Sequence, residues 1–175
     1  MAPSLPPLTL VLGGARSGKS AFAEGLVTRL PGPWLYVATG EARDAEMAER
    51  IAHHVRRRGP DWITREVPLD LADLVGETAA APRPMLIDCL TLWLSNVMLA
   101  ERNVEAECAR LVNALARAPG PIVAVSNEVG LGIVPDNALA RAFRDAQGRL
   151  NAAVAREAQS VVLMAAGLPL TLKQA

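Results

Sequence analysis

The stretch "GGARSGKS", residues Gly13 to Ser20, decides what fold can be expected of this 175-residue chain. It satisfies the pattern G-x-x-x-x-G-K-[ST], whose last two positions are Lys19 and Ser20. The pattern requires a buried strand before the loop and a helix after it. The apolar run Leu8–Gly14 predicts that strand, and residues 19–30 predict the helix. Because both requirements are met, the stretch predicts a phosphate-binding loop.

Glycines allow such a loop to fold tightly, so that several backbone N–H groups point inward at phosphate oxygens. Lys19 is expected to act catalytically by reaching the outer phosphates, and the Ser20 hydroxyl is expected to coordinate Mg²⁺. The dipole of the following helix favours the same anionic ligand. We therefore expect GTP, ATP or both as substrates, together with Mg²⁺. The expected nucleotide contacts in the loop are Gly13, Gly14, Ala15, Arg16, Ser17, Gly18, Lys19 and Ser20.

Short apolar runs alternate with helical segments along the rest of the chain. Further strands are expected at Trp34–Thr39, Met85–Leu90, Ile122–Gly130 and Ser160–Gly167, with a short edge strand at 169–173. Further helices are expected at Asp44–Arg57, Leu90–Leu99, Val104–Arg117 and Ala138–Ala158. Nearly continuous apolar strands are typical of a parallel sheet that is covered on both faces. The pattern predicts an α/β fold, a P-loop NTPase-like three-layer sandwich with a mostly parallel sheet.

Size and composition favour one nucleotide-binding catalytic domain over residues 1–175, with residues 1–7 as a flexible N-terminal extension. Eighteen basic residues balance eighteen acidic ones, which argues against binding to nucleic acid or to an anionic membrane. Asp88 and Asn96 interrupt the best candidate for a membrane span, so no membrane insertion is expected. The two cysteines show no metal-ligand spacing, and no signal peptide is evident. A cytoplasmic location is expected.

Asp88 ends the strand "MLID" and is the candidate for a second carboxylate at the nucleotide site. Proteins with this phosphate loop usually carry an acidic residue at the end of a neighbouring strand, where it orders the magnesium water shell. Asp88 is therefore a candidate metal and nucleotide ligand. The alternative is that Asp88 caps the helix that starts near Leu90, and both roles can coexist.

The two histidines, His53 and His54, are adjacent but not equivalent. Projection as a helix puts His54 on the apolar side with Met47, and His53 roughly 120° away from Met47. His53 then faces solvent or a cleft, and a plain surface position is the simpler interpretation. If it faces the nucleotide, its neutral imidazole can attack the α-phosphate and release pyrophosphate. The arginines that follow, Arg56, Arg57 and Arg58, then either stabilise phosphate charge or complement the dipole at the helix end.

The segment "SNEVGLGIVP", Ser126 to Pro135, places Asn127 and Glu128 at the carboxyl end of a strand. Ligands of open α/β sheets bind at that edge. An ordinary turn from strand to helix is the competing interpretation.

Several motifs in order along almost the whole chain resemble one family. They are "GGARSGKS", "YVAT", "DAEMAERIAHH", "DWITREVP", "LIDCLTLWLSN", "SNEVGLGIVP" and "RAFRDAQGRLNAAVA". Together they resemble the bifunctional adenosylcobinamide kinase / adenosylcobinamide-phosphate guanylyltransferase family of cobalamin biosynthesis.

The resemblance implies two reactions and, usually, a homotrimer. A nucleoside triphosphate first phosphorylates the aminopropanol hydroxyl of adenosylcobinamide. GTP then donates GMP to adenosylcobinamide phosphate, which yields adenosylcobinamide-GDP and pyrophosphate. In the family the first histidine of the pair carries the GMP, and that residue is His53 here.

The resemblance also implies GTP contacts outside the phosphate loop. These are Ala38, Thr39 and Gly40 after the second strand, His54, Val55, Arg56 and Arg57 behind the nucleophile, and Glu66 and Asp88. Without the resemblance, Glu66 is interpreted as an exposed strand residue. Relatives often carry a polar residue at the position of Gly40, so a backbone contact is expected there rather than one from a side chain.

Two other functions compete with this one. A P-loop small-metabolite kinase without nucleotidyl transfer explains the loop and Asp88 but leaves His53 without a role. A GTP-dependent switch usually recognises guanine through an N-K-x-D motif after a strand. The comparable position here has the sequence "SNEVG", which argues against a switch.

Overall fold

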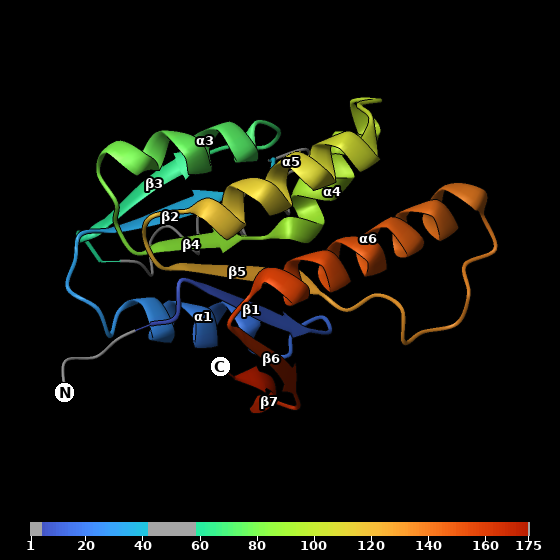
Figure 1. The fold of residues 1–175 in the computed structure, drawn as a ribbon. Helices are drawn as coiled ribbons and strands as arrows, with labels where there is room; N and C mark the ends of the chain where they lie inside the picture. Colours follow the sequence, from blue (N-terminus) through green and yellow to red (C-terminus); the bar gives the residue numbers. More distant parts are fainter. Residues whose placement is uncertain (1–4, 42–58, 175) are drawn as a thin grey trace.

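The structure is a computed structural model that describes residues 5–41 and 59–174 (Figure 1). Within these residues seven strands form one sheet in the order β3-β2-β4-β5-β1-β6-β7. Its strands are β1 (Leu8–Gly13), β2 (Trp34–Ala38), β3 (Trp62–Glu66), β4 (Met85–Asp88), β5 (Ile122–Asn127), β6 (Ser160–Ala165) and β7 (Leu168–Gln174). All neighbouring strands pair in parallel except β6 and β7, which are antiparallel. The predicted α/β fold with a mostly parallel sheet is confirmed.

The described helices cover the two faces of the sheet unequally, as Figure 1 shows. They are α1 (Lys19–Val27), α3 (Leu71–Glu77), the 3₁₀ turn η1 (Thr78–Ala80), α4 (Leu90–Leu99), α5 (Val104–Arg117) and α6 (Ala138–Glu157). Helix α1 packs on one face, where Ala23 and Val27 meet Val11 and Val125. The other described helices pack on the opposite face around the fully buried Trp93. None of the described helices is long and apolar enough to cross a membrane.

Helix α3 and the 3₁₀ turn η1 were not predicted, and β3 was anticipated only through the interpretation of Glu66 as an exposed strand residue. β3 is an edge strand with exposed residues after Trp62, so it lacks the apolar run of a buried strand. α3 has only seven residues, with Leu71, Leu74 and Val75 buried, which is too short to establish a period in the sequence. The helix predicted at 44–57 lies outside the described residues.

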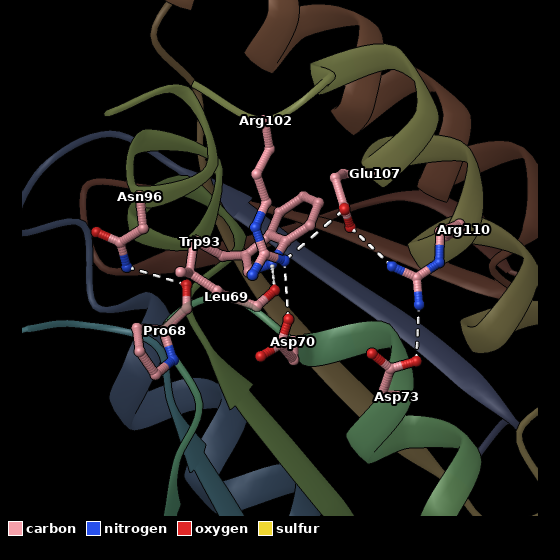
Figure 2. A network of polar contacts seen from close by, with 9 residues as sticks. All are labelled: Pro68, Leu69, Asp70, Asp73, Trp93, Asn96, Arg102, Glu107 and Arg110. Carbon is pink, nitrogen blue, oxygen red and sulfur yellow. Dashed lines mark hydrogen bonds and ion pairs between the residues drawn. The ribbon is translucent and has the colours of Figure 1, made fainter. Parts of the chain in front are cut away.

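The chain between β3 and α3, and the start of α3, are held by polar contacts from α4, from α5 and from the turn between these two helices (Figure 2). The indole N–H of Trp93 donates to the carbonyl of Leu69 at 2.8 Å, which satisfies the polar atom of a buried ring. The guanidinium of Arg102 pairs with Asp70 at 2.8 Å, and that of Arg110 pairs with Asp73 at 2.7 Å. These two pairs are partly exposed, so we expect the buried indole to contribute more to stability.

Residues 5–7, part of the predicted N-terminal extension, contact the sheet. The backbone N–H of Ile122 donates to the carbonyl of Pro7 at 2.9 Å, which extends the pairing of β1 with β5. Leu5 packs against the apolar cluster on the α1 side of the sheet. Apolar contact and a ladder hydrogen bond therefore hold this part of the segment, whereas residues 1–4 lie outside the described chain.

Candidate nucleotide-binding and catalytic site

The loop between β1 and α1 requires glycine at two positions, Gly13 for lack of space and Gly18 for its backbone conformation. A Cβ atom at Gly13 would lie 2.7 Å from the carbonyl oxygen of Met164 and 2.5 Å from the Ser17 Oγ. Gly18 precedes α1 with a φ of +92°, a conformation that other residues rarely adopt. The Ser17 hydroxyl is buried beside Gly13 and has no hydrogen-bond partner in the described part of the chain. A buried hydroxyl without a partner fits a loop that is completed by the oxygens of a ligand.

Lys19 begins α1 and is buried, with 8% of its surface exposed. Its ammonium donates to the carbonyl of Gly14 at 2.7 Å, so the side chain folds back over its own loop. Burial lowers the pKa of Lys19 from its ordinary value, and the neighbouring Cys89 and Asp88 partly oppose this shift. Burial also raises the pKa of Cys89 to about 11, so this thiol is protonated near pH 7. Among the described residues, Asp88 is therefore the neighbouring acidic side chain that favours the charged form of Lys19.

Asp88 ends β4 on the same face of the sheet as α1. Side chains alternate along a strand, and Leu86, two residues earlier, packs into the cluster on the α1 side. The Tyr36 hydroxyl donates to Asp88 Oδ2 at 2.9 Å. The residue that caps α4 is Cys89, without a side-chain capping bond, so the capping role considered for Asp88 is not seen.

One expectation about Asp88 needs correction. β4 is not the neighbour of the phosphate-loop strand, because β5 lies between β4 and β1. The carboxylate therefore faces the loop across the end of β5. Long-range pairing sets this order, and the sequence of β4 does not encode it.

The oxygen donors on this face suit Mg²⁺, which needs few protein ligands. They do not suit a metal ion whose ligands all come from the protein. Ser20 in the first turn of α1 offers a hydroxyl, and Asp88 offers carboxylate oxygen. Among the described residues no cluster of three or more His, Cys, Asp or Glu side chains could hold a metal ion. Mg²⁺ commonly binds through one or two protein oxygens together with substrate phosphates and water. Ser20 and Asp88 fit that mode of binding.

The segment Ala38–Thr39–Gly40 follows β2, further along the same edge. The Thr39 side chain is fully buried, and its hydroxyl both accepts from the Cys89 N–H at 2.8 Å and donates to the Cys89 carbonyl at 2.7 Å. Asn96 of α4 donates to the carbonyl of Thr39 at 2.8 Å and to that of Pro68 at 3.1 Å, the second bond being visible in Figure 2. Thr39 thus joins β2 to β4, and its side chain is engaged inside the protein. A Cβ at Gly40 would lie 3.1 Å from Leu92, so glycine also suits close packing there.

Glu66 lies at the far end of this edge. It is the exposed last residue of β3 and pairs in register with Ala38. Four strand-to-strand steps separate β3 from β1, roughly 19 Å at the usual spacing of strands. The structure brings Asp88 to the phosphate loop but leaves Glu66 well away from it.

The remaining predicted site residues, His53, His54, Val55, Arg56 and Arg57, lie outside the described residues. Sequence reasoning missed the Tyr36 hydroxyl that contacts Asp88 and the Asn96 amide that holds Thr39. The signal for Asn96 was an amide within the otherwise apolar helix "LTLWLSNVML". Tyr36 offered no comparable signal, because a tyrosine in an apolar strand is ordinary.

Comparison with known protein sequences identifies a family and similar proteins. Residues 9–172 match the family described as cobinamide kinase / cobinamide phosphate guanyltransferase. The chain is 45% identical over 166 residues to the bifunctional adenosylcobalamin biosynthesis protein CobP of Pseudomonas aeruginosa, covering 94% of this chain and 96% of that protein. It is 39% identical over 181 residues to the bifunctional adenosylcobalamin biosynthesis protein CobU of Salmonella typhimurium, covering 95% and 99%.

A solved structure supports the fold alone. An ATPase from the type III secretion system of pathogenic bacteria superposes with a TM-score of 0.56 at 10% identity, covering 94% of this chain and 56% of that one. The phosphate loop, the mostly parallel sheet and the extent of the sequence match lead to one assignment. The chain belongs to the cobinamide kinase / cobinamide phosphate guanyltransferase family.

Proposed function

We propose that this chain phosphorylates adenosylcobinamide with a nucleoside triphosphate and then transfers GMP from GTP to adenosylcobinamide phosphate. The family description names both activities, and both relatives are called bifunctional and match over nearly their whole length. One structural observation supports the phosphoryl-transfer half most directly. The glycine loop, the buried Lys19 and the carboxylate of Asp88 lie on one face at the carboxyl edge of the sheet.

In the first reaction the substrate hydroxyl oxygen attacks the γ-phosphorus of the nucleotide. The bond from that phosphorus to the β–γ bridging oxygen breaks, a nucleoside diphosphate leaves, and the hydroxyl proton passes to solvent. Catalysis of this kind rests on positioning and on neutralising phosphate charge. The loop N–H groups hold the phosphates, and Lys19 exchanges its contact with the Gly14 carbonyl for one with an outer phosphate. Ser20 and Asp88 hold Mg²⁺, which when bound supplies positive charge to the phosphate oxygens.

In the second reaction His53 is the nucleophile. A ring nitrogen attacks the α-phosphorus of GTP, the bond to the α–β bridging oxygen breaks, and pyrophosphate leaves. A phosphate oxygen of adenosylcobinamide phosphate then displaces the imidazole and forms adenosylcobinamide-GDP. This covalent step lets two large substrates use the site in turn. The remaining proposed GTP contacts are Ala38–Gly40, His54–Arg57 and Glu66.

A small-metabolite kinase without nucleotidyl transfer is the second candidate function. The observation in its favour is that the described catalytic groups, Lys19 and Asp88, both serve phosphoryl transfer. It predicts no covalent nucleotide on the protein.

Labelled GTP distinguishes the two functions. The protein is incubated with GTP labelled at the α- or the γ-phosphate, denatured, and examined for bound label. We expect an acid-labile, alkali-stable adduct from the α-label alone. His53→Ala should lose this adduct and all guanylyl transfer while keeping measurable kinase activity. Asn113→Ala, at an exposed site on α5, is the control that should keep the adduct. Absence of an adduct in the unsubstituted protein would leave only the kinase.

Assembly and location are further parts of the proposal. We propose a cytoplasmic homotrimer, in line with the family resemblance. The loop between β5 and α6, which extends away from the sheet in Figure 1, exposes 87% of Leu131 and 99% of Ile133. Exposed apolar side chains of this kind are often covered in assemblies. Light scattering coupled to size exclusion should give three times the mass of 18.5 kDa, and a monomer would overturn the trimer.

A further inference from the structure

Strand β5 ends between the two parts of the phosphoryl-transfer site. Its last residue, Asn127, pairs in register with Gly13 of the phosphate loop. On its other side, Val125 pairs with Asp88. β5 therefore extends two residues beyond the partner of Asp88, and Asn127 lies where a nucleotide phosphate would meet both Lys19 and Asp88.

The side chain of Asn127 lies on the α1 face of β5. Val123 and Val125 pack into the cluster on that face, and alternation along the strand puts Asn127 with them. Ser126 lies on the opposite face, where its hydroxyl meets α6. Adjacent strands are about 4.8 Å apart, so the amide of Asn127 is within reach of a phosphate that binds on the neighbouring loop.

The backbone of Asn127 is held by two side chains rather than by the sheet alone. Its N–H donates to Thr91 Oγ1 at 2.7 Å, and its carbonyl accepts from Asn151 Nδ2 at 3.0 Å. Both partners are buried and come from different helices, α4 and α6. These bonds fix the direction in which Asn127 leaves the sheet.

A buried polar network supports these two side chains. Ser126 donates to Asn151 Oδ1 at 2.7 Å, and Gln147 Nε2 donates to Ser126 Oγ at 3.0 Å and to Asn151 Oδ1 at 2.9 Å. Gln147 Oε1 is buried and has no hydrogen-bond partner among the described residues. An incompletely satisfied network costs stability compared with an apolar core. Such a network is better explained by positioning than by stability.

The carboxylate of Glu128, the residue after Asn127, is engaged elsewhere. Glu128 uses its carboxylate to accept from the Gly130 N–H at 2.7 Å, and its own N–H donates to the Gly13 carbonyl at 3.1 Å. Its side chain thus turns back to its own loop. Within the described residues the Asn127 amide makes no side-chain hydrogen bond, which leaves it available to a ligand.

We propose that the Asn127 side-chain amide donates a hydrogen bond to the γ-phosphate of the nucleotide held by Gly13–Ser20. Thr91 and Asn151 act through it as positioning residues. The inference rests on the proposed phosphoryl transfer at this loop. A neutral amide suits a position between a lysine and a carboxylate, because it binds phosphate oxygen without repelling the charge of Lys19.

The test compares a triphosphate with a diphosphate. Calorimetry with Mg²⁺ measures Kd for the β,γ-imido analogue of ATP and for ADP, and for the corresponding guanine nucleotides. We expect Asn127→Ala to raise Kd for the triphosphate analogues about 5- to 10-fold, the loss of one hydrogen bond to a charged group. Kd for the diphosphates should stay within about twofold, because no γ-phosphate is present. Asn127→Asp should weaken the triphosphate further by repulsion.

Controls separate this role from a merely structural one. Asn113→Ala, at an exposed site on α5, should leave both Kd values unchanged. Thr91→Val removes the hydroxyl that holds Asn127 and should reduce the preference for triphosphate, and Thr91→Ser should restore it. Equal losses for di- and triphosphates in the Asn127 variants, or no loss for either, would overturn the proposal. An unchanged preference in Thr91→Val would overturn the positioning role.

This test is independent of the labelled-GTP experiment. It uses no corrinoid and no covalent step, so failure to form a GMP adduct leaves the nucleotide preference to be measured. Conversely, a lost γ-phosphate contact does not bear on His53.

Discussion

The two ends of the sheet's carboxyl edge are built differently. At the β1–β5–β4 end, the glycine loop is closely packed, and Lys19 and Asp88 each make a partly buried hydrogen bond. At the β2–β3 end, Thr39 is buried inside the protein and Glu66 is exposed on an edge strand. The first end combines a tight glycine loop with a buried lysine and a carboxylate, whereas the polar groups described at the second end are either engaged inside the protein or exposed. We infer from this difference that, in the proposed function, phosphoryl transfer uses the β1–β5–β4 end and the guanylyl step draws on the β2–β3 end.

The substitution Lys19→Ala is the strongest test of this difference between the two ends. Loss of the cation that neutralises the outer phosphates should lower the rate of phosphorylation at least about 100-fold. The melting temperature should not fall, because burial disfavours the charged lysine in the folded protein. Rates are measured with saturating nucleotide, and stability is measured by thermal unfolding.

Lys173→Ala is the matched control, because Lys173 is the only other lysine of the sequence. Lys173 lies on β7 and donates to the backbone carbonyls of Ala155 and Arg156. Its removal should leave phosphorylation unchanged. Normal phosphorylation by Lys19→Ala would show that the β1–β5–β4 end is not the phosphoryl-transfer site.

Substitutions at two glycines of the phosphate loop test whether this end of the sheet is closely packed. A Cβ at Gly13 would meet the backbone oxygen of Met164 at 2.7 Å, so Gly13→Ala should cost about 1–3 kcal/mol by overpacking. Each kcal/mol lowers Tm by roughly 2–4 °C in a chain of this size. Gly14→Ala meets no atom within 4 Å and should change stability by less than about 0.5 kcal/mol. Similar melting temperatures for the two variants would contradict the close packing.

The smallest effect is expected at the opposite end. Glu66→Ala removes an exposed carboxylate, so Tm should move by no more than about 2 °C. Guanylyl transfer should fall about tenfold through the loss of a charged hydrogen bond, and phosphorylation should stay unchanged. Glu105→Ala, at an exposed site on α5, is the control for the loss of one acidic side chain. A larger effect of Glu66→Ala on phosphorylation than on guanylyl transfer would reverse the assignment of the two ends.

Much of the fold was predictable because its signals are local. The strands β1, β5 and β6 are runs of buried aliphatic residues, and the helices α4 and α5 begin and end at the predicted residues. β3 was not predicted as a buried strand, because an edge strand need not be apolar. The burial of Thr39 was equally hidden, since its partners Cys89 and Asn96 are distant in the sequence.

The sequence by itself determined that this protein has a phosphate loop on a parallel α/β sheet. Glycine spacing and apolar runs act over a few residues, so they can be recognised without knowledge of the rest of the molecule. Only the tertiary structure decided that β5 lies between β1 and β4, and hence that Asn127 stands between Gly13 and Asp88. The physical reason is that strand order results from hydrogen bonds and packing between distant segments. No single strand encodes which neighbours it will have.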